Sequence, residues 1–245
     1  MILLKHKRFY LALLLVSSGS VLQAQAVQPP VGKYGIPVIK EVAMYDATVK
    51  ADSNNQMAEL KSVIPGLVYD LRYASDKNFM RRNMYPARTT YTFMRLPAAK
   101  ALAGVEKELN EKGMGLKIFD AYRPYSVTEK FWELVLNEKY VADPKKGSGH
   151  NRGLAVDLTV IYLQNRKDLQ MPTGFDNFSD TAHHSFMNLP FDAMQNRKML
   201  KDIMEKYGFV AMETEWWHYS WPDPNNKYFA MDISFADLKN DQPKK

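Results

Sequence analysis

The chain has 245 residues, of which 33 are Lys or Arg and 27 are Asp or Glu, so its formal net charge is +6 at neutral pH. The length suits one sizeable domain, and no basic block with interleaved aromatic residues occurs, which argues against a nucleic-acid-binding protein. The sequence has no cysteine, which excludes disulfide bonds, thiolate metal ligands and lipid attachment through a cysteine.

Residues 1–26 have the order of a secretory signal peptide. A basic segment at 5–8 precedes an apolar run at 9–16, and residues 24–26 supply the small residues of a cleavage site. The apolar run is about half the ~20 residues that span a bilayer, so we expect cleavage after Ala26 and no stable membrane insertion afterwards. Cleavage removes three basic residues and no acidic one, which lowers the charge from +6 to +3. The predicted location is periplasmic or secreted.

Residues 27–62 contain three prolines and a polar run at 52–56. We expect them to form an arm with little regular structure that wraps around a catalytic domain spanning residues 63–245.

Strand and helix patterns then alternate. Residues 63–73 alternate apolar and polar side chains after a glycine, which is typical of a strand. Apolar residues at helical spacing predict a helix over 96–112, with Gly113 as its C-terminal cap. Residues 116–120 form a short strand that ends at a turn.

The second half continues this alternation. Ser126 and Glu129 have the spacing of a capping box, which predicts that a helix begins at Ser126. We expect a strand at 153–162, an amphipathic helix at 191–207, and one or two strands within 209–221. These elements predict an α+β fold: a single domain with a central, mostly antiparallel sheet flanked by helices.

Two motifs carry candidate metal ligands. His150 and Asp157 lie seven positions apart, and Glu215 and His218 follow some sixty residues later. Three nitrogen and oxygen ligands with a spare acid or base are typical of a catalytic zinc site, whereas a structural site uses four protein ligands. In one regular strand, His150 and Asp157 would point to opposite faces, so the glycine-rich segment must turn before the strand begins. The site is therefore expected where the sheet meets a loop.

Glu215 and His218 are given different roles. The imidazole binds the metal, and the carboxylate stays uncoordinated and takes a proton from the attacking water. Glu213 is a second candidate for this base. Arg123 follows a strand end and precedes a proline, so it is either a cation that stabilises the oxyanion or a surface arginine. The adjacent pair at 183–184 is expected to be structural, because neighbouring histidines rarely face one ion.

With these residues identified, the chain resembles the D-alanyl-D-alanine dipeptidases of the VanX type, in the zinc peptidase group that also includes VanY-type D,D-carboxypeptidases. The resemblance runs from about residue 68 to residue 229. The His-x6-Asp and Glu-x-x-His motifs mark the wider group. The segments that point to the dipeptidase branch are 70–79, 120–124, 175–176, 182–184 and 215–219.

The resemblance implies one zinc ion per chain, bound by His150, Asp157 and His218. It further implies that Glu215 is the general base and that Arg123 stabilises the transition state.

The resemblance also implies that Tyr73, Ser148 and Asp176 hold the free ammonium group of the substrate. An ammonium group needs an anionic partner and hydrogen-bond acceptors, and a closed cavity limits the substrate to two residues. The expected substrate is therefore the small peptide D-Ala-D-Ala.

The sequence departs from this family in two places. Gly149 stands where a hydroxyl residue is common, and the predicted signal peptide and arm are additions. Export favours hydrolysis of D-Ala-D-Ala during peptidoglycan turnover over depletion of a cytosolic pool. Two alternatives stay open: a D,D- or L,D-carboxypeptidase that trims stem peptides, and a zinc-binding module without catalysis. Glu215 and Arg123 argue against the module, because binding alone needs neither.

Overall fold

The computed structural model describes residues 28–87 and 89–242. The predicted signal peptide lies outside these residues. Within them, no helix is both long enough and apolar enough to cross a membrane.

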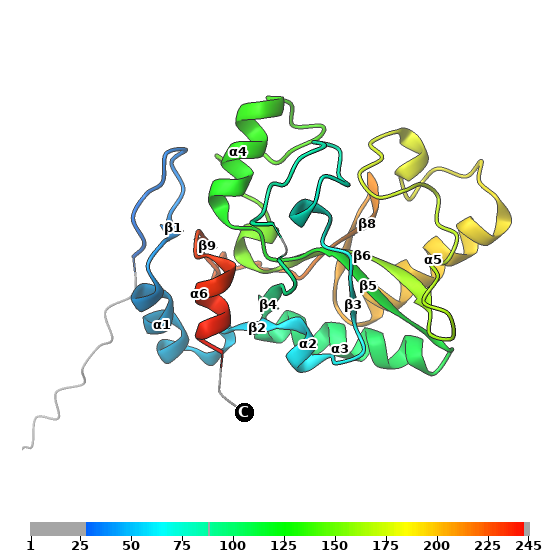
Figure 1. Ribbon diagram of the computed structural model, residues 1–245, viewed down its shortest axis with the longest axis horizontal. Coiled ribbons are helices and arrows are strands. Elements are labelled where there is room, and N and C mark those ends of the chain that lie inside the picture. Colours follow the sequence, from blue (N-terminus) through cyan, green and yellow to red (C-terminus); the bar gives the residue numbers. More distant parts are fainter. Residues whose placement is uncertain (1–27, 88, 243–245) are drawn as a thin grey trace, which may run out of the picture.

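A five-stranded sheet forms the centre of the molecule (Figure 1). Its strands, in spatial order, are β3 (Val68–Tyr69), β5 (Met114–Asp120), β6 (Ala155–Tyr162), β8 (Glu215–Ser220) and β7 (Val210–Met212). Strand β3 runs parallel to β5, and every other neighbouring pair is antiparallel. The predicted mostly antiparallel sheet is therefore confirmed.

The main hydrophobic core lies between this sheet and two long helices, α3 (Leu96–Asn110) and α5 (Phe191–Lys206). In α3, apolar residues three or four positions apart, such as Leu102 and Val105, are fully buried, which is the pattern of an amphipathic helix. Both helices match the predicted ranges within two residues at each end. Gly113 has a φ of +71°, the left-handed conformation expected of a residue that follows a helix.

The start of α4 (Tyr125–Val135) differs from the expected capping box. The backbone N–H and the hydroxyl of Ser126 both donate to Asp232 Oδ1, at 3.0 and 2.6 Å. Pro124 occupies the N-cap position without a side-chain cap. The carboxylate of Asp232 thus takes the place that the capping box gave to Glu129. Sequence spacing alone does not reveal this substitution, because Asp232 is distant in the chain.

The arm has more regular structure than expected. It contains the ten-residue helix α1 (Val42–Ala51), and its strand β1 (Val38–Ile39) pairs in parallel with β9 (Ala230–Met231). Strand β2 (Met57–Glu59) pairs with β4 (Phe93–Arg95), and α2 (Leu60–Val63) follows β2 directly. The buried Tyr45 and Ile39 belong to a second hydrophobic core that also contains residues of α6 (Phe235–Asn240). The apolar residues of the arm pack against the domain, and this packing stabilises regular structure that the proline-rich composition does not predict.

The predicted strand over 63–73 is shorter than expected. Only β3 pairs with the sheet, and a 3₁₀ turn at Arg72–Ala74 follows it. This turn buries Tyr73 beside the cavity described next.

Candidate metal and substrate site

Three neighbouring strands align the central side chains of the site. In the sheet register, Asp120 of β5 lies opposite Asp157 of β6, and Asp157 lies opposite His218 of β8. Antiparallel partners directly opposite each other have their side chains on the same face. The strand pairing therefore brings together residues that lie nearly a hundred positions apart in the chain.

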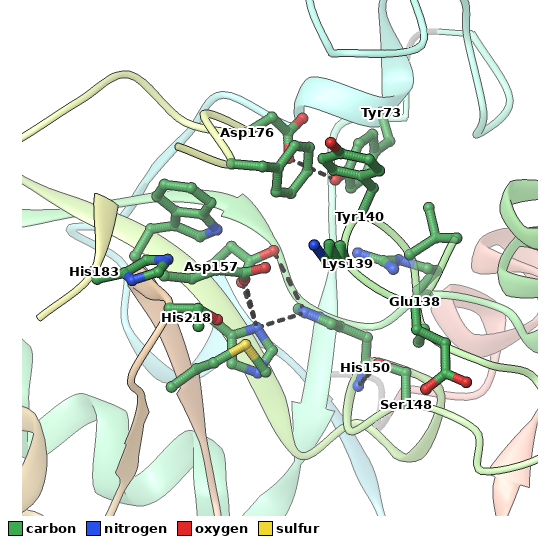
Figure 2. A pocket seen from close by; sticks show the side chains of 18 of the residues that line it. Tyr73, Glu138, Lys139, Tyr140, Ser148, His150, Asp157, Asp176, His183 and His218 are labelled. Atoms are coloured by element: carbon green, nitrogen blue, oxygen red, sulfur yellow. Dashed lines mark hydrogen bonds and ion pairs between the residues drawn. The ribbon is translucent and has the colours of Figure 1, made fainter. Parts of the chain in front are cut away.

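His150, Asp157 and His218 form a buried cluster (Figure 2). His150 Nε2 lies 3.4 Å from Asp157 Oδ2, and His218 Nδ1 lies 2.9 Å from Asp157 Oδ1. The two imidazole nitrogens are 3.3 Å apart. Two imidazoles and one carboxylate are the donor set of a divalent transition metal, and their convergence on one point fits a single ion.

Hydrogen bonds outside the cluster orient both imidazoles. His150 Nδ1 lies 2.7 Å from the carbonyl oxygen of Ala121, which can only accept, so Nδ1 carries the proton and Nε2 presents a lone pair. His218 Nε2 lies 3.1 Å from Ser220 Oγ, which leaves Nδ1 facing the cluster. Such outer partners fix the tautomer and the ring orientation of metal-binding histidines.

A glycine turn allows His150 and Asp157 to face the same point. His150 lies in the 3₁₀ turn His150–Arg152, which ends at Gly153 with a φ of +70°. A β-carbon at Gly153 would lie 2.5 Å from Met57 Cε, so the position favours glycine for both conformation and space. The expected turn before strand β6 is present.

The cluster is electrostatically coupled. Burial alone would raise the pKa of Asp157, but the imidazoles of His150 and His218 outweigh it and hold that pKa well below its usual range. Burial lowers the pKa of His218, but the Asp157 carboxylate, which accepts a hydrogen bond from the imidazole, outweighs this, so the net direction is upward. The carboxylate is thus ionised and ready to bind a cation.

Glu215 lies beside the cluster, with Oε2 3.8 Å from His218 Nδ1. Burial raises the pKa of its carboxyl group. Glu213, the second candidate base, is exposed and accepts a hydrogen bond from the backbone of Ser185. Of these two glutamates, only Glu215 lines the cavity.

Arg123 is a buried residue of the site, which excludes the surface interpretation. Its Nε and Nη2 donate to Asp120 Oδ2 at 3.1 and 2.6 Å, and its guanidinium group lies over the ring of Tyr73. Burial lowers the pKa of Arg123, but the Asp120 carboxylate outweighs it, so the group stays charged. Asp120 in turn accepts a 2.5 Å hydrogen bond from the hydroxyl of Tyr85.

Tyr73 and Asp176 meet on the other side of the cavity. The Tyr73 hydroxyl donates to Asp176 Oδ1 at 3.0 Å, whereas the buried Oδ2 has no hydrogen-bond partner among the described residues. Burial and the charge of Asp157 raise the pKa of Asp176 to about 8. Asp176 also has a φ of +60°, a conformation uncommon for residues other than glycine. A strained residue with an unused acceptor indicates a binding position.

The other predicted residues occupy different parts of the site. Ser148 lines the same cavity, of about 610 Å³, but in Figure 2 it lies on the far side of His150 from the Tyr73–Asp176 pair. Its hydroxyl accepts from the backbone N–H of His150 at 3.2 Å. Of the two adjacent histidines, His183 lines the cavity and His184 does not.

Sequence reasoning assigned no role to several residues that support the site. Asp120 and Tyr85 hold Arg123, and the carbonyl group of Ala121 orients His150. Asp120 and Ala121 lie within three positions of Arg123, so the sequence already shows that they are close to it. The contribution of Tyr85, 35 residues before Asp120, depends on tertiary packing.

Comparison with known proteins gives one family. Residues 53–238 match the peptidase family M15 described as D-ala-D-ala dipeptidase. The D-alanyl-D-alanine dipeptidase of Escherichia coli (strain K12) is 32% identical over 167 residues, which cover 68% of this chain and 85% of the relative. The enzyme of the same name from Enterococcus faecium is 28% identical over 197 residues, covering 71% of this chain and 96% of the relative.

Proposed function

This chain belongs to the D-Ala-D-Ala dipeptidase family of metallopeptidases, and we propose that it uses one zinc ion to hydrolyse D-Ala-D-Ala to free D-alanine in the cell envelope. The observation that carries the substrate assignment is Oδ2 of Asp176, which has no hydrogen-bond partner within residues 28–87 and 89–242. Asp176 lines the same cavity as the His150, Asp157 and His218 cluster.

His150, Asp157 and His218 would hold the metal through Nε2, a carboxylate oxygen and Nδ1. When bound, zinc would supply a Lewis acid that lowers the pKa of water toward neutrality. Nitrogen and oxygen donors also accept other divalent ions, and the family resemblance together with the three-ligand composition supports the choice of zinc.

Glu215 acts as the proton carrier. Its carboxylate takes a proton from the attacking water and delivers it to the nitrogen of the leaving D-alanine. Its place beside His218, inside the cavity, allows it to reach both partners without binding the metal itself.

Arg123 stabilises the negative charge that develops on the scissile carbonyl oxygen. The hydrogen bonds from its Nε and Nη2 to Asp120 fix the guanidinium group before the substrate arrives. A preorganised cation in a buried site stabilises the transition state without reorganising during the reaction.

Asp176 and Tyr73 bind the free ammonium group of the dipeptide. The ammonium group donates to Asp176 Oδ2, and its charge favours the ionised form of that carboxylate. An N-acylated or longer peptide has no ammonium group at this position, so Asp176 Oδ2 gains no partner from it. The role of Ser148 at the ammonium group stays a prediction, since the structure gives no contact between Ser148 and either residue.

The test is a comparison of three substrates with purified protein. Free D-Ala-D-Ala should be cleaved, whereas N-acetyl-D-Ala-D-Ala and a pentapeptide that ends in D-Ala-D-Ala should be cleaved at least about a hundredfold more slowly, as expected when a buried polar group loses its hydrogen-bonding partner on the substrate. Release of D-alanine from the pentapeptide at a rate similar to that from free D-Ala-D-Ala would identify a carboxypeptidase instead. Binding of zinc without hydrolysis of any of the three would identify a binding module.

The location is proposed from the sequence of residues 1–26, and wall turnover is the role that export favours. Deleting the gene should remove D-Ala-D-Ala hydrolysis from the periplasmic fraction. Unchanged hydrolysis in that fraction would contradict the role.

A further inference from the structure

The cavity has an unequal charge distribution. Besides the metal ligand Asp157, its lining includes the carboxyl groups of Asp176, Asp180, Glu138 and Glu215. A substrate carboxylate that entered such a cavity without a cationic partner would be repelled and poorly solvated.

Two basic side chains line the same cavity. Arg123 already donates two N–H groups to Asp120 and is assigned to the scissile carbonyl oxygen, so it is not available to a second group of the substrate. Lys139, an exposed residue, is the other, and none of the ion pairs among the described residues includes it. In Figure 2 its side chain lies between the Tyr73–Asp176 pair and His150.

The neighbours of Lys139 do not compete for its charge. Glu138, the adjacent residue, pairs with Lys146 at 2.7 Å. The backbone N–H of Lys139 donates to Asn137 Oδ1 at 3.0 Å, in the loop that follows α4. This bond fixes the backbone near the cavity and leaves the ammonium group available.

A dipeptide brings its carboxylate close to the scissile bond. One residue separates the two, and a residue spans at most about 3.6 Å, so both must lie within the same cavity. Asp176 and Tyr73 account for the amino end and the His150 cluster for the scissile bond, but no group has been assigned to the carboxylate.

We infer that Lys139 binds the C-terminal carboxylate of the dipeptide and so makes a free C-terminus part of the specificity. This inference rests on the proposed function. A lysine ammonium group is a flexible point charge, which suits a carboxylate that arrives with the substrate. The cavity thereby presents an anion to the amino end of the substrate and a cation to its carboxyl end.

The experiment compares D-Ala-D-Ala with its C-terminal amide for the wild type, Lys139→Met and Lys139→Arg. The amide should be the poorer substrate of the wild type by about tenfold in kcat/KM. Lys139→Met should lower kcat/KM for the free acid about tenfold, mainly through KM, and leave the amide nearly unchanged. Lys139→Arg should restore most of the preference for the free acid. Lys145→Met is the matched control in the same loop, since Lys145 does not line the cavity, and it should keep the wild-type ratio.

The outcomes separate the two claims. If the wild type cleaves D-Ala-D-Ala and Lys139→Met keeps the wild-type preference for the free acid, the assignment of Lys139 is wrong and the proposed function stands. If Lys139→Met lowers kcat/KM equally for the free acid and the amide, the residue has a structural role and the assignment is also wrong. If the wild type cleaves neither compound, the proposed function itself fails.

Discussion

At the residue scale, Glu215 and Glu213 provide a natural pair for testing the proton carrier. They lie two positions apart, but only Glu215 reaches the cavity. We predict that Glu215→Gln lowers kcat for D-Ala-D-Ala by at least about a hundredfold, the usual range for loss of a general base, while about one zinc per chain is retained. Steady-state kinetics and metal analysis measure both quantities. Glu213→Gln should behave like the wild type, and high activity of Glu215→Gln would remove Glu215 from the mechanism.

The raised pKa of Asp176 gives a pH-dependent prediction. Because burial raises its pKa to about 8, the folded protein holds a proton that the unfolded chain releases near pH 4. The resulting stability is fully present below about pH 4 and is lost as the pH rises to about 8. Asp176→Asn carries no such charge, so its Tm should increasingly exceed that of the wild type over this range.

Calorimetry of the substrate-free proteins at several pH values tests this prediction. Asp180→Asn serves as the control, since Asp180 is an exposed carboxylate at the same cavity, and its Tm difference from the wild type should be flat with pH. Asp176→Asn should also raise KM for D-Ala-D-Ala. If the Tm advantage of Asp176→Asn over the wild type is no larger at pH 8 than at pH 5, the burial of this carboxyl group is contradicted.

At the element scale, a buried tyrosine hydroxyl links two elements of the arm. The hydroxyl of Tyr45 in α1 accepts the backbone N–H of Met57 in β2 at 2.8 Å. Tyr45→Phe leaves this N–H buried without a partner, so we predict a loss of about 1–3 kcal/mol in the free energy of unfolding. Denaturant unfolding measures it. Tyr34→Phe in the same arm should change stability little, because its hydroxyl contacts only the exposed Glu133 at 3.5 Å.

The elements also show where sequence reasoning succeeds and fails. Helix α3 and strand β6 follow from local periodicity, and the structure confirms both. The predicted capping box at the start of α4 was wrong, because Asp232, about a hundred positions away, supplies the hydrogen-bond acceptor for Ser126. Helix α1 was missed because its amphipathic pattern is weak and its burial depends on packing against distant elements.

The site shows the same division. Chemistry and spacing identified His150, Asp157, His218 and Glu215, and the structure brings these four together. Lys139 gave no signal, because its position beside the cavity depends on the path of a loop without regular structure.

At the scale of the whole molecule, the predicted cleavage site falls just before the packed arm. We predict that mass spectrometry of the exported protein finds Val27 as the first residue. Cleavage there would leave intact the hydrogen bond from the Val38 N–H to the Pro30 carbonyl and the pairing of β1 with β9. Lys5→Glu with Lys7→Glu should reduce processing, because export signals need a basic start. An unprocessed protein that still begins at Met1 after export would contradict the prediction.

The row formed by Asp120, Asp157 and His218 across three strands has a consequence for the timing of metal loading. The ligands come together only after distant segments of the chain have paired, and such long-range pairing forms late because closing long loops costs entropy. A chain exported before it folds cannot carry the ion with it. If the proposed export precedes folding, the zinc would come from the envelope, and enzyme maturation would depend on the metal available outside the cytoplasm.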